Sequence, residues 1–213
     1  MTLMMLLCAC FVLANYAPVK AHEIYYEGTP PNGTAIVLKW NKLSSGKAHL
    51  EMNGDYLSSS YSGQYATAAI MWPTYSSKVK VDQASFSSST VDLATATESY
   101  WNNRFGYLIS RNYLGICDAT TTDNVLITSP QTAKNSSKKI KHASIYLTPF
   151  TSDLESNNHK IQLMVHEIGH ALGLGHSDAE FYPSTADSVM KRYGYHGYYP
   201  PRTHDINDLN NKY

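Results

Sequence analysis

The eleven residues 166–176 constrain the fold of this chain more than any other part of the sequence. They read HEIGHALGLGH, with histidines at positions 166, 170 and 176. On an α-helix, His166 and His170 would lie one turn apart and about 40° from each other around the axis. Gly173 would end that helix, because a residue without a Cβ accepts the left-handed conformation that follows many helices. The segment therefore predicts a helix, a sharp turn and a third histidine that meet at one point.

This arrangement suits a metal ion. Two imidazole nitrogens on one helix face can reach a zinc ion at about 2.0–2.1 Å, and His176 can supply a third nitrogen. Three protein ligands leave a fourth position open, which is typical of catalytic rather than structural zinc sites. Glu167 projects about 100° from His166, so it can hydrogen-bond a metal-bound water without ligating the ion. The alternative, an amphipathic helix with three solvent-facing histidines, explains the combined spacing poorly.

The other side of the predicted helix is apolar. Apolar residues that recur at helical spacing form a stripe that packs against a hydrophobic core. One face of the helix is therefore expected to pack and the other to hold metal. The stripe consists of Ile161, Met164, Val165, Ile168 and Leu172.

The run HEIGHALGLGHS, residues 166–177, resembles the matrixins, the matrix-metalloprotease branch of the metzincin zinc peptidases. Metzincins also carry a methionine turn beneath the metal, and Ser188-Val189-Met190 lies where that turn is expected. By this resemblance Met190 is an apolar floor under the imidazoles and not a ligand. Residues 203–209 resemble the closing helix of matrixin domains, with Thr203 as the expected N-cap. The specific resemblance covers residues 159–213, about a quarter of the chain.

The resemblance implies an α+β, metzincin-like (zincin-like) catalytic domain with a twisted mixed sheet, an active-site helix and a C-terminal helix. It implies a zinc endopeptidase in which His166, His170 and His176 hold one zinc ion. Glu167 would be the catalytic general base that assists attack of a zinc-bound water on the peptide bond. Protein or peptide substrates would bind in extended form.

Two alternatives to a peptidase remain open. One is a catalytically inactive zinc-binding or adhesion protein with a metzincin fold, although the intact Glu167 argues against it. The other is a metal-dependent hydrolase that acts on non-peptide bonds.

Matrixins also bind structural zinc and calcium in an Asp/His-rich loop before the active-site helix. The corresponding segment here, 129–141, is rich in Ser and Lys and has no ligand spacing. We therefore expect one catalytic zinc ion, no structural zinc and no calcium. The remaining histidines also lack motif spacing and are predicted to be non-ligands: His22, His49, His142, His159, His196 and His204.

Several tyrosines follow Met190. Some metzincins place a metal-assisting tyrosine two residues after the methionine, but Tyr193 is one position too far along. We expect the tyrosines to wall a pocket beside the zinc instead, and surface tyrosines in a tail are the alternative. The set is Tyr193, Tyr195, Tyr198 and Tyr199.

Residues 1–21 are expected to be a signal peptide. Residues 3–14 are apolar, too short to span a bilayer, and Val19-Lys20-Ala21 fits a small-residue cleavage site, although a positively charged n-region is missing. Residues 22–213 would then be the secreted, extracellular metallopeptidase domain. A membrane anchor, or a lipid anchor at Cys10, is the weaker alternative.

The composition narrows the possible partners. The chain has 17 basic and 17 acidic residues and no charged run, so nothing indicates nucleic acid or an anionic membrane surface. Its 213 residues suit one domain with its own core, and we expect a monomer. Removal of the leader would also remove Cys8 and Cys10. Cys117 would then have no disulfide partner and is predicted to be a buried, inert thiol.

Upstream of the metal motif the sequence predicts elements only coarsely. Segment 91–101 is interpreted as a helix or a loop. A helix is predicted over 58–72, closed by Pro73. The strand at 143–148 is expected to be the sheet's edge strand, where an extended substrate would bind, and an interior strand is the alternative. Further strands are predicted at 36–40, 48–52 and 79–82.

Overall fold

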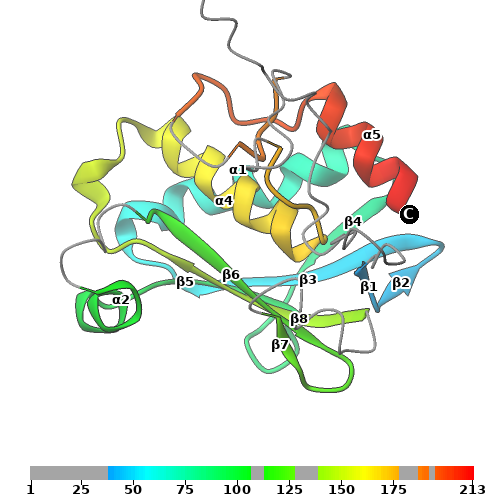
Figure 1. The fold of residues 1–213 in the computed structure, drawn as a ribbon, viewed down its shortest axis with the longest axis horizontal. Helices are drawn as coiled ribbons and strands as arrows, with labels where there is room; N and C mark the ends of the chain where they lie inside the picture. The colour runs from blue at the N-terminus through cyan, green and yellow to red at the C-terminus, as the bar shows by residue number, and fades with distance from the viewer. Residues whose placement is uncertain (1–37, 107–112, 128–138, 178–186, 192–194) are drawn as a thin grey trace, which may run out of the picture.

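The computed structural model describes residues 38–106, 113–127, 139–177, 187–191 and 195–213. It is an α+β structure with a twisted mixed sheet (Figure 1), as predicted. The predicted signal peptide lies outside the described residues. The strands are β1 (Lys39–Trp40), β2 (Leu43–Ser44), β3 (Lys47–Tyr56), β4 (Val79–Gln83), β5 (Val91–Thr95), β6 (Gly115–Thr121), β7 (Leu126–Ile127) and β8 (Lys139–Leu147). The helices are α1 (Ser59–Tyr75), α2 (Glu98–Phe105), α4 (Asn157–Ala171) and α5 (Thr203–Lys212), with a 3-10 turn at Thr151–Asp153.

The sheet combines parallel and antiparallel pairs. Strands β4, β3, β5 and β8 run parallel in that order, and β6 is antiparallel to β8. Along β8, Ala143, Ile145 and Leu147 alternate on the core side and are fully buried. Such alternation is expected of a sheet that packs one face against a core. The strands predicted at 48–52 and 79–82 fall within β3 and β4 and are confirmed.

Strand β8 is an interior strand, so the prediction that 143–148 forms the edge was wrong. It pairs with β5 on one side and with β6 on the other. Within the described residues, 115–118 of β6 pair only with β8, because β7 joins β6 further along. Strand β6 was not recognised from the sequence, because its buried positions carry little apolar surface. They are Cys117, Ala119 and Thr121.

Helix α1 continues through Pro73, so the prediction that this proline closes it was wrong. A proline in the last turn removes only one helical hydrogen bond. The fully buried Trp72 fixes this turn, and its carbonyl accepts a hydrogen bond from Ser76 N–H at 2.9 Å. Burial of one large side chain therefore outweighs the local signal of the proline.

Segment 91–101 is neither a single helix nor a loop. It begins as the interior strand β5, in which Val91 and Leu93 are fully buried. Helix α2 follows after its N-cap Thr97, whose hydroxyl accepts a hydrogen bond from Tyr100 N–H at 3.2 Å. The two-residue periodicity of Val91 and Leu93 was the signal for the strand.

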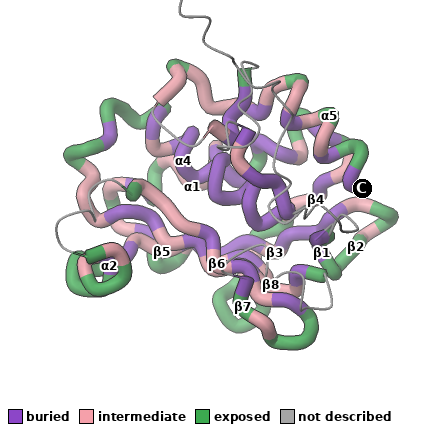
Figure 2. Tube along the Cα trace, viewed as in Figure 1, coloured by how far each residue is buried: buried purple, intermediate pink, exposed green. Residues whose placement is uncertain are grey.

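Helices α1 and α4 pack side by side on the sheet (Figure 1). Trp72 Nε1–H donates to Val165 O at 2.9 Å and joins the two helices. Helix α4 is buried almost all round (Figure 2) rather than along one stripe. None of the described helices is long and apolar enough to cross a membrane.

Helix α5 was expected to begin with Thr203 as its N-cap, but Arg202 occupies that position. The side chain of Asp205, three residues after the cap, accepts a hydrogen bond from Arg202 N–H at 2.7 Å. A carboxylate in the first turn also complements the helix dipole. The predicted C-terminal helix is confirmed. Its N-cap is one residue earlier than predicted, at Arg202 instead of Thr203.

Candidate metal centre

The turn after α4 has the geometry that the sequence predicted. The helix ends at Ala171, and Gly173 follows with φ of +82°. Gly173 N–H donates to His170 O at 2.8 Å, and Leu174 N–H donates to Gly169 O at 2.9 Å. These two hydrogen bonds form a Schellman motif, in which the left-handed residue reverses the chain.

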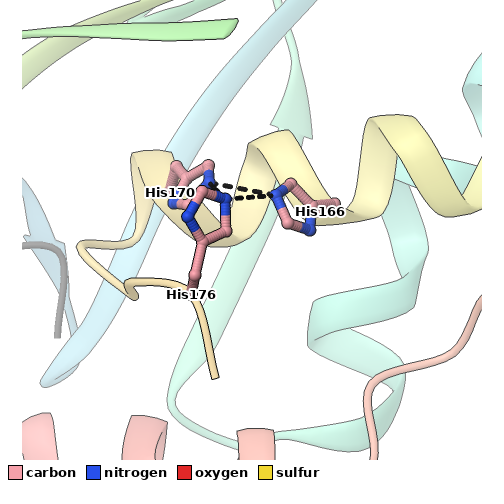
Figure 3. Close-up of side chains that lie close together, drawn as sticks. All are labelled: His166, His170 and His176. Atoms are coloured by element: carbon pink, nitrogen blue, oxygen red, sulfur yellow. Dashed lines mark hydrogen bonds between the residues drawn. The ribbon is translucent and has the colours of Figure 1, made fainter. Parts of the chain in front are cut away.

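This reversal brings the three predicted ligands together (Figure 3). The Nε2 atom of His166 lies 3.1 Å from that of His170 and 3.2 Å from that of His176. The third Nε2–Nε2 distance, between His170 and His176, is 3.2 Å. Nitrogens bound tetrahedrally to zinc at about 2.0–2.1 Å would lie about 3.3 Å apart. The three side chains therefore fit one zinc ion, and in the described ranges they are the one such group of potential ligands.

Hydrogen bonds to the backbone define the tautomers of two rings. His166 Nδ1 lies 2.9 Å from Val189 O, and His170 Nδ1 lies 2.7 Å from Leu174 O. A carbonyl oxygen only accepts, so each of these Nδ1 atoms must carry a proton, and in the neutral rings Nε2 of His166 and of His170 then presents a lone pair. A single proton could be shared by only one pair of the three Nε2 atoms, whereas one metal ion can bind all three nitrogens. The donor set therefore fits a metal ion.

Glu167 is buried beside the ligands, with 4% of its surface exposed. Among the described residues its Oε2 has no hydrogen-bond partner. Burial, and then the negative charge of Asp118, raise the pKa of Glu167 to about 8. A cation nearby would favour the charged form and lower this pKa. A Cβ at Gly115 would lie 2.8 Å from Glu167 Cδ, so glycine at this position of β6 leaves room for the carboxyl group.

Met190 is fully buried and packs against Gly169 of α4, which directly precedes the candidate ligand His170. A Cβ at Gly169 would meet Met190 Sδ and would lie 2.9 Å from Trp72 Cζ2. Glycine inside a helix costs about 1 kcal/mol relative to alanine, and this close packing explains its presence. Met190 O also accepts a hydrogen bond from Ser177 N–H at 3.0 Å, which ties the turn to the residue after His176.

Asp205 holds the 188–190 turn from α5, a function that was not predicted. Its carboxylate is fully buried and accepts hydrogen bonds from Ser188 Oγ–H at 2.6 Å and Val189 N–H at 3.0 Å. Ser188 Oγ in turn accepts one from Met190 N–H at 2.9 Å. The carbonyl that orients His166 belongs to Val189, so Asp205 supports this candidate ligand through the turn. In the sequence, Asp205 is recognisable only as an acidic residue in the first turn of a helix, and such a residue is usually solvent-exposed.

The tyrosines after Met190 have separate contacts. Tyr198 Oη accepts a hydrogen bond from Ser188 N–H at 3.0 Å, and its O–H lies 3.2 Å from Ser188 O, so it supports the turn. Tyr195 stacks on His159 with ring centroids 5.1 Å apart, and Tyr199 packs against the core. That these tyrosines wall a pocket beside the zinc stays a prediction. Tyr193 lies outside the described residues.

None of the other described histidines belongs to the 166/170/176 group, and three of them pair with carboxylates. His49 Nε2 lies 2.7 Å from Asp82 Oδ2, and His142 Nε2 lies 2.9 Å from Asp92 Oδ2. His204 Nδ1 lies 3.3 Å from Asp208 Oδ2. His22 and residues 129–138 of the Ser/Lys-rich segment lie outside the described residues.

Cys117 lies on β6 and is 2% exposed, as predicted for a buried thiol. It forms no disulfide within the described part of the chain. Burial, followed by the charges of Glu167 and Asp118, raises the pKa of the thiol well above its usual value. The protonated thiol is a poor nucleophile and a poor metal ligand.

No protein-family model and no curated protein matches the chain. Among solved structures, it is similar to high choriolytic enzyme 1, a hatching-enzyme zinc-protease from the medaka fish Oryzias latipes. The sequence identity is 11% and the TM-score 0.43, with 81% of this chain and 92% of that chain covered. A similarity this low carries no argument about function, so the function is inferred from the geometry of the site.

Gly169→Ala should destabilise the protein, because the new methyl group would meet Met190 and Trp72. Overpacking of this kind costs about 1–3 kcal/mol. Gly63 in α1 is the matched control, since a Cβ there meets nothing within 4 Å. Gly63→Ala should stabilise by about 0.5–1 kcal/mol. Urea unfolding of both metal-free variants measures the two changes, and equal effects would contradict the packing assigned to Gly169.

Replacing His166, His170 or His176 singly by alanine should lower the bound zinc well below one ion per chain, because each ring supplies one nitrogen. Elemental analysis after dialysis measures this. His142→Ala removes a histidine that pairs with Asp92 and should leave the zinc content unchanged. A triad variant that retains stoichiometric zinc would remove that residue from the ligand set.

Proposed function

We propose that this chain is a secreted zinc endopeptidase of the matrixin-like branch of the metzincins. The observation that carries the proposal is the convergence of three Nε2 atoms beside the buried carboxyl group of Glu167. A three-nitrogen ligand set leaves a position for water or substrate, as catalytic zinc sites do. A structural site would instead close the fourth position with a protein ligand.

The protein's own groups would divide the work. His166, His170 and His176 would hold the zinc, with Val189 O and Leu174 O fixing two of the rings. When bound, zinc would supply Lewis-acid polarisation of the scissile carbonyl and of a water molecule. The carboxylate of Glu167 would accept a proton from the attacking water and return it to the leaving nitrogen. Met190 would form the apolar floor.

Strand β6 supports the proposed substrate class. Within the described residues, 115–118 pair only with β8, so the backbone groups on the other side of this strand could bind an extended peptide. Gly115 packs directly against Glu167, so a peptide added to this strand would pass the catalytic carboxyl group. Recognition through backbone hydrogen bonds favours a protein or peptide substrate over an ester or a glycan. We propose that the enzyme acts as an extracellular monomer.

Glu167→Gln should abolish most hydrolysis of unfolded protein and leave one zinc per chain. The amide keeps the shape of the side chain but cannot accept the proton, and loss of a general base costs about 10²–10⁴-fold. Glu98→Gln, at an exposed position of α2, is the matched control and should keep full activity.

Retention of more than about a tenth of wild-type kcat/KM by Glu167→Gln, a loss of under about 1.4 kcal/mol, would contradict the general-base role. A zinc-loaded wild-type protein that cleaves esters or glycans but no peptide would overturn the substrate class. Zinc binding without hydrolysis of any of these would favour the inactive binding protein.

A further inference from the structure

The side chain of Tyr213 joins the sheet to the end of α4. Trp40 N–H, in β1, donates to the Tyr213 hydroxyl oxygen at 2.7 Å. The hydroxyl donates in turn to Leu172 O at 3.0 Å. Burial raises the pKa of this hydroxyl well above its usual value, so it keeps the proton that it donates.

Leu172 is the C-cap of α4, and its carbonyl lies at the helix end, where carbonyl groups lack an N–H donor within the helix. Tyr213 supplies that partner. The next residue is Gly173, which reverses the chain, and Leu174 O follows with its hydrogen bond to His170 Nδ1. The turn 172–174 therefore orients one ligand directly and leads within two residues to His176.

The same turn is enclosed by distant parts of the chain. A Cβ at Gly173 would lie 2.6 Å from Leu38 O and 2.8 Å from Lys212 Cε, so both pack tightly over it. Tyr213 is itself fixed, because Lys78 Nζ donates to its backbone oxygen at 2.9 Å. Because Tyr213 is fixed at its backbone, its hydroxyl can hold the turn 172–174 in place.

We propose that Tyr213 is a positioning residue of the metal centre. Its hydroxyl holds the turn 172–174, and through it His170 and His176, in the geometry that binds the ion. This inference rests on the proposed zinc site. It predicts that the bridge slows release of the metal, because a loosened turn lets ligand nitrogens leave one at a time.

Tyr213→Phe tests the proposal, since it keeps the ring and removes both hydrogen bonds. The matched control is Tyr61→Phe, which removes another buried hydroxyl, one that donates to Thr148 O at 3.0 Å. The rate of zinc release from each loaded protein is measured with an excess of a chromogenic chelator. Partners that contact ligands directly change metal affinity about 10–100-fold, and Tyr213 acts one contact further away. We expect release to be on the order of three- to tenfold faster in Tyr213→Phe and unchanged in Tyr61→Phe.

Hydrogen exchange in the metal-free proteins separates positioning from a general loss of stability. In Tyr213→Phe, faster exchange should be confined to the amide of Trp40, which loses its acceptor, and to those of Gly173 and Leu174. Equal acceleration throughout α1 and α4 would overturn the proposal, as would wild-type zinc release by Tyr213→Phe. Wild-type zinc release by Tyr213→Phe would leave the proposed zinc site itself unaffected. A wild-type protein that binds no zinc would overturn the site and the positioning role together.

Discussion

Three imidazole nitrogens that face one another at 3.1–3.2 Å set the central constraint on this structure. Their lone pairs repel unless a cation lies among them, so the fold must hold the rings together against that repulsion. It does so with backbone carbonyls, Val189 O for His166 and Leu174 O for His170. Each carbonyl fixes both the tautomer and the direction of its ring. The arrangement of the three rings therefore depends on the two turns that carry these carbonyls.

Both turns are held by α5 and its C-cap. Near the start of the helix, the buried carboxylate of Asp205 binds the 188–190 turn. At the other end, Tyr213 binds the carbonyl of Leu172 and connects it to β1. Buried polar groups that are fully hydrogen-bonded make a structure rigid, whereas an unmade partner is costly. The closing helix thus supports both turns around the candidate metal centre, although none of its residues belongs to the three-histidine group.

The convergence of the three histidines was more predictable than the sheet around them. His166, His170 and Gly173 lie on one helix and its terminal turn, and local backbone geometry fixes their relation. The order of strands depends on pairing between distant segments, and for that reason 143–148 was misplaced at the edge and β6 was missed. Gly115, Asp205 and Tyr213 act through tertiary contacts that leave almost no local signal. Only the fold shows that a glycine makes room for Glu167, or that a tyrosine 41 residues away binds the C-cap of α4.

X-ray absorption at the zinc edge tests the central claim most directly. The zinc-loaded protein should show about three imidazole nitrogens and one oxygen ligand at about 2.0–2.1 Å, the pattern of an open catalytic site. Multiple scattering from the imidazole rings gives the number of bound histidines independently of the zinc–ligand distances. A sulfur ligand at about 2.3 Å would contradict the account, because it would require Cys117 or another thiol to close the site. Four imidazoles around the ion would contradict it equally, since no position would remain for water or substrate.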